Sequence, residues 1–341
     1  MFDALIGNHQ IKTALGRLVK SDRFPQSSIF VGKDGIGKKQ FALEIAKGLV
    51  CPVFDYFESC RTCSACRRAE KFNLPTSGKK EDYEQVFFSA HPDIGLVIPN
   101  KQTIYINAIR DLEREANFRP YEANARFLII DEAEKMSAAA SNALLKTLEE
   151  PPETVYIFLI TSHPASLLPT IHSRCQTIRF LPIEKNEIER YLFEEKNYSS
   201  QDAQLIANLS RGSIGNALKV DLDSFREKRA QMFEVLETLA EGSHYTSLLR
   251  TAEEINRSKD KEVFEDYLST LQTLVHDIWK LANDKTSEIT NIDATYEIEK
   301  FSVPIPRLAK WLEEIENLRE NLRSNLNRKI ATNALFMKMA G

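Results

Sequence analysis

The sequence predicts an α/β protein whose first half forms a doubly wound, five-stranded parallel sheet, followed by two helical regions. Five apolar runs alternate with helical patterns, and continuous apolar runs are typical of parallel strands covered on both faces. A glycine-rich loop directly follows the first run, and the C-terminal third contains helical patterns only. The five runs are residues 29–31, 94–98, 127–130, 155–160 and 177–180.

The length and composition indicate a protein with more than one domain. A chain of 341 residues exceeds one ordinary core, so we expect a core at 1–180, a small helical lid at 181–220 and a helical domain at 221–341. No run approaches the roughly 18 apolar residues of a membrane span, and the start, MFDALIGNHQ, lacks the features of a signal peptide. We therefore expect a cytoplasmic protein without a membrane segment. The net charge of -4 gives the whole chain no attraction for nucleic acid, so any DNA contact would need a local basic face or charge from partners.

The first element is a helix at residues 8–20. Ile11, Leu15 and Leu18 fall on one face of it, and Asn8 suits the N-cap position. The chain then enters the first strand and the glycine-rich loop.

That loop has the spacing of a phosphate loop, G-x-x-x-x-G-K. Gly32, Gly35 and Gly37 would let backbone N–H groups turn inward around phosphates, and Lys38 would reach the outer phosphates. The next position should carry Ser or Thr to ligate Mg²⁺, but it holds Lys39, which brings a competing positive charge. The loop is therefore predicted to suit phosphate and to suit hydrolysis poorly.

Four cysteines follow the phosphate-loop helix with the spacing C-x8-C-x2-C-x2-C. They are Cys51, Cys60, Cys63 and Cys66. Two overlapping C-x2-C steps and a fourth thiolate suit tetrahedral Zn²⁺, and four sulfur ligands leave no position for water, so we predict a structural zinc site. A redox C-x2-C pair is the alternative, although it would not need the other two cysteines.

The next segment combines a charged loop with two short strands. Residues 73–90 read as an exposed loop, and strands at 94–98 and 103–106 lead into a helix at 107–118. His91 could be a metal or catalytic residue, but it has no partner at ligand spacing, so a turn role is the simpler interpretation.

Polar side chains follow two of the predicted strands. Asp131 and Glu132 end the strand at 127–130, where Asp131 would sit beside Mg²⁺ and Glu132 would orient the attacking water. Thr161 ends the strand at 155–160 on the same sheet edge, where it could sense the outermost phosphate. Simple polarity at a strand end is an equally good account of Thr161.

The last part of the core contains a helix at 138–149, with Ser137 as its N-cap, and a turn that carries Arg174 before the final strand. Helical patterns then continue to the end of the chain, with breaks near Gly242, at 284–296 and near Pro304. The final helix is predicted to keep one apolar stripe with a spacing close to four residues. That stripe comprises Leu318, Leu322, Leu326, Ile330, Ala334 and Met337.

Together these motifs resemble the subunits of the clamp loader of bacterial DNA polymerase III, most closely the delta-prime subunits. The motifs are GKDGIGKK, the cysteine spacing, LIIDEAEKM, NALLKTLEEPP and LLPTIHSRCQ, and the resemblance covers nearly the whole chain. It implies an AAA+ core at 1–180 with a zinc module at 51–66, a lid at 181–220, and a collar at 221–341 through which subunits assemble.

The resemblance also assigns roles to single residues. In that family the arginine of the SRC motif is an arginine finger, so Arg174 would act in trans on the nucleotide of a neighbouring motor subunit. From the turn sequence by itself, a surface salt bridge is the simpler interpretation. Two positions depart from the motor subunits: Lys39 replaces their hydroxyl residue, and Gly215 replaces a lid arginine that touches nucleotide. Both departures fit delta-prime, which resembles the motors without driving the cycle.

The resemblance therefore implies a delta-prime-like subunit that supports ATP-dependent loading of the sliding clamp on primed DNA during replication. Its expected partners are gamma/tau-like motor subunits and a delta-like subunit through the collar, and the sliding clamp and primer-template DNA through the complex. Its expected cofactor is structural Zn²⁺. We expect no polymerase site and no hydrolysis of ATP with Mg²⁺ by this chain, although the loop could still hold nucleotide or an anion.

Two alternatives stay open at this point. One is a gamma/tau-like motor ATPase in which Asp131 and water complete the Mg²⁺ shell. The other is a zinc-containing DNA-binding module that uses basic residues near the C-terminus. These are Arg319, Arg323, Arg328 and Lys329. The acidity of the chain and the apolar stripe along the same segment disfavour the DNA-binding module.

Overall fold

The computed structural model describes the chain except for residues 1–4, 22, 54–58, 243–244, 258–259 and 322–326. It divides into two compact units, which we describe separately. Unit 1 consists of residues 1–191 and 211–218, and unit 2 consists of residues 192–210 and 219–341. None of the described helices is both long enough and apolar enough to cross a membrane.

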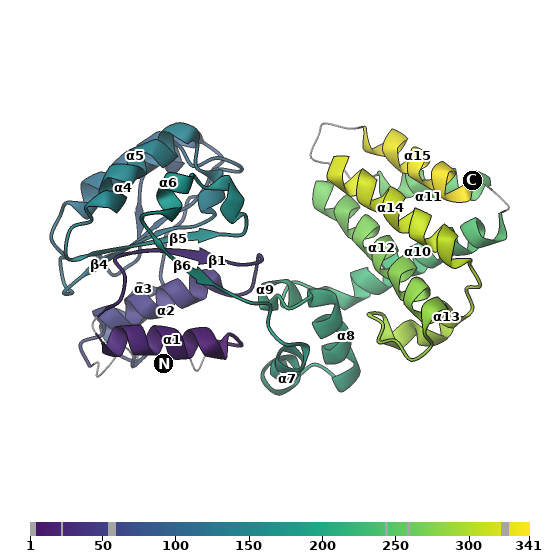
Figure 1. Cartoon of the computed structure of the whole chain (residues 1–341), viewed down its shortest axis with the longest axis horizontal. Coiled ribbons are helices and arrows are strands. Elements are labelled where there is room, and N and C mark those ends of the chain that lie inside the picture. Colours follow the sequence, from purple (N-terminus) through teal and green to yellow (C-terminus); the bar gives the residue numbers. More distant parts are fainter. Residues whose placement is uncertain (1–4, 22, 54–58, 243–244, 258–259, 322–326) are drawn as a thin grey trace. The chain divides into compact units, whose positions relative to one another are not determined.

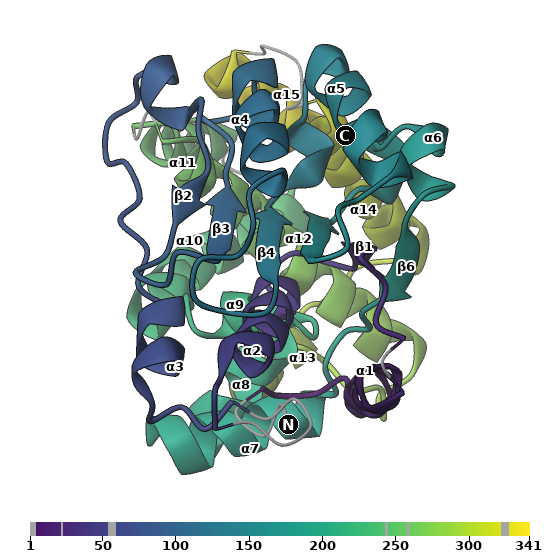
Figure 2. The ribbon, with the colours of Figure 1, turned by 90° about the vertical axis from the view of Figure 1, so that its left-hand side faces the viewer.

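Unit 1 is built around a six-stranded sheet with the order β2-β3-β4-β5-β1-β6. Figure 2 labels β2, β3, β4, β1 and β6 in this order across the sheet. The strands are β1 (Ser27–Val31), β2 (Phe87–Phe88), β3 (Ile94–Val97), β4 (Arg126–Ile130), β5 (Val155–Thr161) and β6 (Gln176–Arg179). Every neighbouring pair is parallel except β2 with β3. The five predicted parallel strands are therefore confirmed, and an antiparallel edge strand is added to them.

Helices cover both faces of this sheet (Figure 1). One face carries α1 (His9–Lys20), α2 (Lys38–Val50) and α3 (Ser64–Ala69), and the other carries α4 (Ile106–Ala116), α5 (Ala138–Glu149) and α6 (Pro169–His172). Side chains of a strand alternate between faces, so Phe127 and Ile129 of β4 pack in the first layer while Leu128 and Ile130 pack in the second. The doubly wound arrangement is confirmed.

Three local predictions in unit 1 were wrong. Residues 103–106 form isolated bridges instead of a strand, and α4 begins at Ile106. The segment 73–90 is not a plain exposed loop, because it holds a 3-10 helix at Lys80–Tyr83 and strand β2, whose Phe87 is buried. Strand β6 is largely exposed instead of buried, because it lies at the sheet edge with β1 as its neighbour.

Unit 2 is helical in its described residues. Its helices are α8 (Ser200–Ser210), α10 (Leu222–Glu241), α11 (Tyr245–Ile255), α12 (Lys261–Asn283), α13 (Thr295–Glu299), α14 (Ile305–Asn321) and α15 (Arg328–Ala340), and α7 (Lys185–Lys196) joins the units. A single apolar cluster runs through α10 to α15, and Trp311 at its centre is fully buried and donates a hydrogen bond to the carbonyl of Met339 at 2.6 Å. This core is separate from the two layers of unit 1.

The predicted stripe of the final helix is not one face. Helix α14 ends at Asn321 and α15 begins at Arg328, while Leu322 and Leu326 lie outside the described residues. Leu318 is buried in α14, but Ile330 is 66% exposed and Met337 is 51% exposed on α15. The described residues of the stripe therefore do not share one buried face.

A buried polar network also stabilises unit 2. Asp277 is completely buried and accepts hydrogen bonds from the backbone N–H groups of Thr290 at 2.9 Å and Asn291 at 2.8 Å, and from the Asn291 amide at 2.7 Å. Arg229 donates to the side-chain amide oxygen Oδ1 of Asn291 and pairs through two hydrogen bonds with Asp293. The network therefore fixes the segment after α12 to α10 and α12.

Candidate functional site

The phosphate loop joins β1 to α2 and depends on its glycines. Gly35 and Gly37 have φ angles of +72° and +96°, a backbone region that strains residues with a side chain. Gly37 is the N-cap residue of α2, so the loop passes directly into the helix N-terminus. The strand, loop and helix therefore have the local arrangement that the spacing predicts.

Lys38 is turned into the loop. Its ammonium is buried and donates hydrogen bonds to the carbonyl oxygens of Gly32 at 2.6 Å and Lys33 at 2.7 Å. Burial lowers its pKa, and the carboxylates of Asp34, Glu134 and Asp131 partly offset this effect. In this arrangement the Lys38 ammonium is bound by the loop's own carbonyl groups.

Lys39 occupies the position where a metal would be expected. Its Nζ atom lies 3.0 Å from Oδ2 of Asp131, the carboxylate predicted to sit beside Mg²⁺. The neighbouring Glu132 has a φ angle of +49° and forms an ion pair with Lys135. Both predicted acidic residues are therefore neutralised by lysines of the same chain.

A polar group that the sequence analysis did not single out lies at the ends of β4 and β5. Glu134 accepts hydrogen bonds from Ser162 Oγ at 2.6 Å and from the Ser162 backbone N–H at 3.2 Å. Burial by itself would raise the pKa of Glu134, but hydrogen bonds from Ser162 and Thr161 outweigh it and hold the pKa at about 2. Thr161 is buried and its hydroxyl accepts from the backbone N–H of His163 at 3.0 Å, so the predicted sensor is engaged in this network. The third position after Asp131 in LIIDEAEKM was the available sequence signal for Glu134.

The segment 212–218 packs directly on the phosphate loop. The backbone N–H of Gly215, in the short helix α9 (Ile214–Ala217), donates to the carbonyl of Gly35 at 2.7 Å, and Ser213 Oγ donates to the carbonyl of Asp34 at 2.9 Å. A Cβ atom at Gly215 would lie 2.9 Å from Gly35 Cα, closer than real side chains approach. Glycine at this position is therefore required by a close backbone contact, which no sequence spacing indicates.

Arg174 lies between α6 and β6 and contacts α5 and α6. Its guanidinium donates to the carbonyl of Thr170 at 2.9 Å and to Ser173 Oγ at 3.2 Å, and it pairs with Glu149 at the end of α5. Its side chain is 29% exposed. The structure thus contains a salt bridge at Arg174, and its partner Glu149 comes from the LEEPP motif.

The four predicted cysteines come together. Their sulfur atoms all lie within 4.8 Å of one another, with 3.9 Å between Cys51 and Cys63 and 4.0 Å between Cys60 and Cys66. Sulfurs bound tetrahedrally to zinc lie about 3.8 Å apart, so the donor set fits the ion. A hydrogen bond from the Cys63 backbone N–H lowers the pKa of Cys60 to about 6, whereas burial raises the pKa of Cys66. The cluster could therefore hold a metal such as zinc.

His91 is buried, its Nδ1 accepts from the backbone N–H of Asp93 at 3.3 Å, and burial lowers its pKa, which favours the neutral ring.

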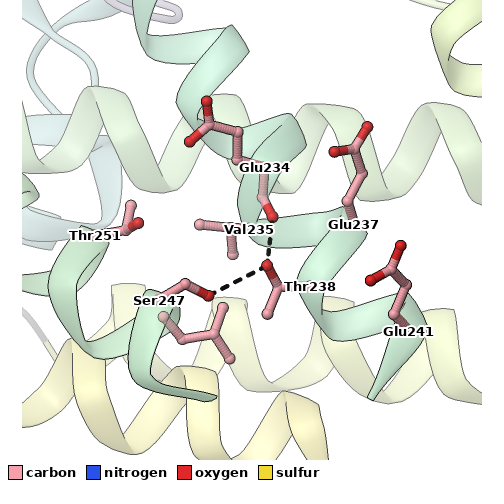
Figure 3. A pocket seen from close by; sticks show the side chains of 8 residues that line it. Glu234, Val235, Glu237, Thr238, Glu241, Ser247 and Thr251 are labelled. Carbon is pink, nitrogen blue, oxygen red and sulfur yellow. Dashed lines mark hydrogen bonds between the residues drawn. The ribbon is translucent and has the colours of Figure 1, made fainter. Parts of the chain in front are cut away.

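In unit 2, a cavity of about 280 Å³ lies between α10 and α11 (Figure 3). Its lining includes the three glutamates Glu234, Glu237 and Glu241. Their negative charges would repel an anionic ligand such as nucleotide.

Comparisons with known proteins give the family. The model of a family described as DNA polymerase III, delta subunit, matches residues 7–184, and that of DNA polymerase III, delta subunit, C terminal, matches residues 224–339. DNA polymerase III subunit delta' of Bacillus subtilis (strain 168) is 35% identical over 222 residues, which cover 65% of this chain and 61% of that protein. DNA polymerase III subunit delta' of Escherichia coli (strain K12) is 27% identical over 310 residues, which cover 89% of this chain and 86% of that protein.

The chain is also similar to a larger protein. DNA polymerase III subunit tau of Escherichia coli (strain K12) is 30% identical over 224 residues, which cover 64% of this chain but only 32% of tau. The matches to the B. subtilis delta' and E. coli tau proteins thus span less than two thirds of those proteins' length. Because the family match covers residues 7–184 and the delta' relatives agree with it, the chain belongs to the DNA polymerase III delta subunit family and is a clamp-loader delta-prime-like protein.

Proposed function

We propose that this chain works in the DNA polymerase III clamp loader as a subunit that assembles with motor subunits and donates an arginine, without hydrolysing ATP itself. The observation that carries this proposal is the ion pair of 3.0 Å between Lys39 and Asp131. Phosphoryl transfer in nucleotide-binding loops of this type needs Mg²⁺ beside the β- and γ-phosphates. An ammonium in that position competes with the metal for the same carboxylate.

Two more contacts support the same conclusion. Lys38 donates to the loop carbonyls of Gly32 and Lys33, so reaching a phosphate would require it to leave both. The Gly215 contact with Gly35 closes the segment 212–218 on the loop, and Gly215 offers no side chain for a phosphate. Lys38, Asp131 and the segment of Gly215 are thus all engaged in bonds within this chain, which supports the proposal.

Steady-state ATP hydrolysis by the purified chain with Mg²⁺ tests the first half of the proposal. We expect no turnover above background, and we expect none from Lys39→Thr, because that change frees Asp131 but leaves the contacts of Lys38 and Gly215 in place. Appreciable turnover by the unaltered chain would overturn the proposal and support a gamma/tau-like motor subunit.

Arg174 supplies the second half of the proposal. In this chain it pairs with Glu149, and we assign it to reach the nucleotide of a neighbouring gamma/tau-like motor subunit in the complex. There it would stabilise charge on the transferring phosphoryl group. A delta-like subunit is the other proposed neighbour, and the sliding clamp and primer-template DNA are contacted through the complex.

Reconstitution with the motor subunits, a delta-like subunit, sliding clamp and primed DNA tests this role. We expect Arg174→Ala to lower ATP hydrolysis at the neighbouring site by about 10³-fold, since arginine fingers contribute at least that factor. Arg179→Ala, an exposed arginine on β6, is the matched control and should hydrolyse normally. Wild-type hydrolysis by an assembled Arg174→Ala complex would exclude the finger role.

We further propose that unit 2 provides the assembly surface. Ile330 and Met337 lie seven residues apart on α15, so they share a face of the helix, and both are more than half exposed. Size-exclusion chromatography of the reconstituted complex checks this, because Ile330→Glu should prevent assembly. Normal assembly of that variant would place the surface elsewhere.

A further inference from the structure

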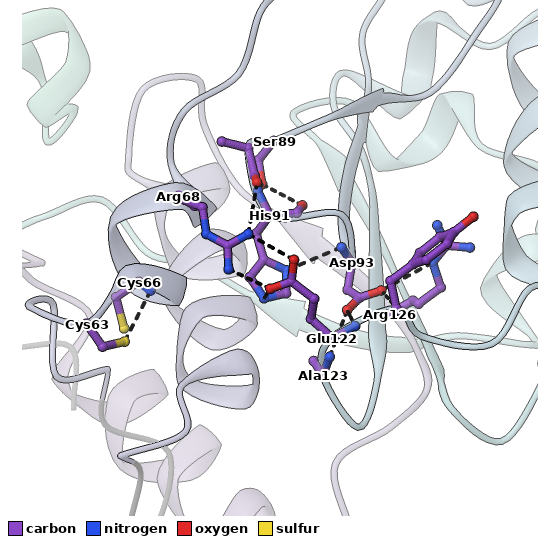
Figure 4. Close-up of polar contacts among 11 residues, drawn as sticks. Cys63, Cys66, Arg68, Ser89, His91, Asp93, Glu122, Ala123 and Arg126 are labelled. Atoms are coloured by element: carbon purple, nitrogen blue, oxygen red, sulfur yellow. Dashed lines mark hydrogen bonds and ion pairs between the residues drawn. The ribbon is translucent and has the colours of Figure 1, made fainter.

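The predicted zinc module is connected to a distant loop by one arginine (Figure 4). Arg68 lies on α3, two residues after Cys66. Its guanidinium donates to both carboxylate oxygens of Glu122 at 3.0 Å and 2.5 Å, and to the carbonyl of Ala90 at 3.3 Å. This pairing raises the pKa of Arg68 and lowers that of Glu122. A two-pronged contact of this kind fixes the orientation of both side chains.

The cysteines determine where α3 begins. Cys63 is the N-cap residue of α3, and its sulfur accepts a hydrogen bond from the backbone N–H of Cys66 at 3.4 Å. The backbone N–H of Cys63 in turn donates to the sulfur of Cys60 at 3.3 Å. A helix of six residues is too short to be stable by itself, so it depends on its anchors. A metal bound by Cys63 and Cys66 would fix both the start and the middle of this helix.

The other end of the connection is the loop 117–123, between α4 and β4. Asp93 is completely buried and accepts hydrogen bonds from three successive backbone N–H groups, those of Tyr121 at 2.7 Å, Glu122 at 2.8 Å and Ala123 at 2.8 Å. Figure 4 shows Glu122 and Ala123 beside Asp93, with the Glu122 side chain turned toward Arg68. Asp93 therefore holds the backbone of this loop at residues 121–123, and Arg68 holds the side chain of Glu122.

This loop presents large apolar side chains at the surface. Phe118 is 48% exposed and Tyr121 is 68% exposed. The ring of Tyr121 lies over the buried guanidinium of Arg126, with 5.3 Å between that group and the ring centre. The position of these rings depends on the backbone that Asp93 and Arg68 hold.

We propose that bound zinc holds the loop 117–123 in its position through Arg68. The ion fixes α3, the helix fixes the guanidinium, and the guanidinium fixes Glu122. Glu70 pairs with Lys47 of α2 and Phe72 pairs with Ser89, so the segment after α3 stays attached without the cysteines. Because the helix has only six residues, loss of the metal at its start is expected to unwind α3 from its N-terminal end and so to loosen the Arg68 contact with Glu122.

Hydrogen exchange of the backbone amides in the full chain tests this proposal. The zinc-loaded chain is compared with the chain depleted by a chelator, and exchange is followed in peptides that cover 117–125. We expect exchange at 121–123 to become about fivefold faster without zinc, the size expected from losing one well-oriented surface ion pair. Peptides covering β4 should not change, which separates the loop from general unfolding.

Two variants test whether the effect of zinc on the loop depends on Arg68. Arg68→Ala should accelerate loop exchange to the same extent with zinc still bound, and chelation of this variant should add little. Arg67→Ala removes an exposed arginine of the same helix and should behave as the unaltered chain. Unchanged loop exchange in Arg68→Ala, or a full effect of chelation in that variant, would overturn the proposal.

The proposal rests on the assignment of zinc to the four cysteines, and the metal content of the purified chain tests that assignment separately. A chain that binds no zinc contradicts the assignment. A chain that binds zinc but shows no change in the loop contradicts only the connection through Arg68.

Discussion

Single side chains at the phosphate loop decide which chemistry remains possible. The backbone of the loop keeps the glycine conformations that phosphate binding uses, but Lys38 and Lys39 direct their ammonium groups to acceptors of the same chain. Lys39 therefore does more than leave position 39 without a metal-ligating hydroxyl. It also pairs directly with the carboxylate of Asp131.

Glu134 offers a test at the scale of one residue. Glu134→Gln removes the charge that accepts the Ser162 hydrogen bonds and should lower the free energy of unfolding by about 1–2 kcal/mol at pH 7. The folded pKa of about 2 lies below the ordinary value of 4.5, so the charge stabilises fully above pH 4.5 and less as pH falls toward 2. Urea unfolding followed by circular dichroism should thus give a smaller difference between variant and unaltered chain at pH 3.

The control for this prediction is a neighbouring acid. Glu132 is 46% exposed, so Glu132→Gln should change the free energy of unfolding by no more than about 0.5 kcal/mol at either pH. Equal losses at pH 3 and pH 7 for Glu134→Gln would contradict the assigned role of its charge.

At the scale of elements, periodicity predicts what is locally encoded. The five parallel strands and most helices follow from apolar runs and caps such as Ser137, whose hydroxyl accepts from Ala140 as predicted. The wrong predictions concern strands whose pairing or burial depends on a neighbouring strand. Strand β2 has only two residues and exists because β3 pairs with it, and β6 is exposed because the sheet ends there.

In the candidate site, too, local features could be predicted from the sequence and contacts between distant residues could not. The glycine spacing and the cysteine spacing could be recognised from the sequence because each is local to one loop. The pairing of Lys39 with Asp131 and the contact of Gly215 with Gly35 join residues far apart in the sequence. No spacing rule links such positions, so only the folded structure reveals them.

The cysteine cluster can be tested as an element. Cys66→Ser should abolish zinc binding, because three thiolates and a hydroxyl are a much poorer donor set for this ion. Cys175 is the matched control: burial raises its pKa to about 12, and Cys175→Ser should keep about one zinc per chain. Metal content after dialysis measures both, and zinc retained by Cys66→Ser would contradict the four-cysteine site.

At the scale of the whole molecule, the two units have separate apolar cores and should respond separately to mutation. Both tryptophans, Trp279 and Trp311, lie in unit 2, so their fluorescence reports that unit only.

Asp277→Asn places an amide donor against N–H donors and should lower the free energy of unfolding of unit 2 by about 2–4 kcal/mol. The denaturant midpoint of the tryptophan signal should fall accordingly.

The matched control lies on the same helix. Asp266 is 60% exposed and pairs with Lys228, so Asp266→Asn should shift the tryptophan midpoint by the equivalent of about 0.5 kcal/mol or less. Glu134→Gln, in unit 1, should leave that midpoint unchanged. A shift of the tryptophan signal by Glu134→Gln would indicate that the units unfold together.

The contact between Gly35 and Gly215 also affects how such a chain could change over generations. A side chain at position 215 would collide with the loop backbone, so a larger residue could be accommodated there only if the loop moved. Under the proposed function, a hydroxyl at position 39 would not by itself give a working ATP site, because the contact between Gly215 and the loop would remain. Gain of that activity would then need substitutions in both segments, and none of them would suffice alone.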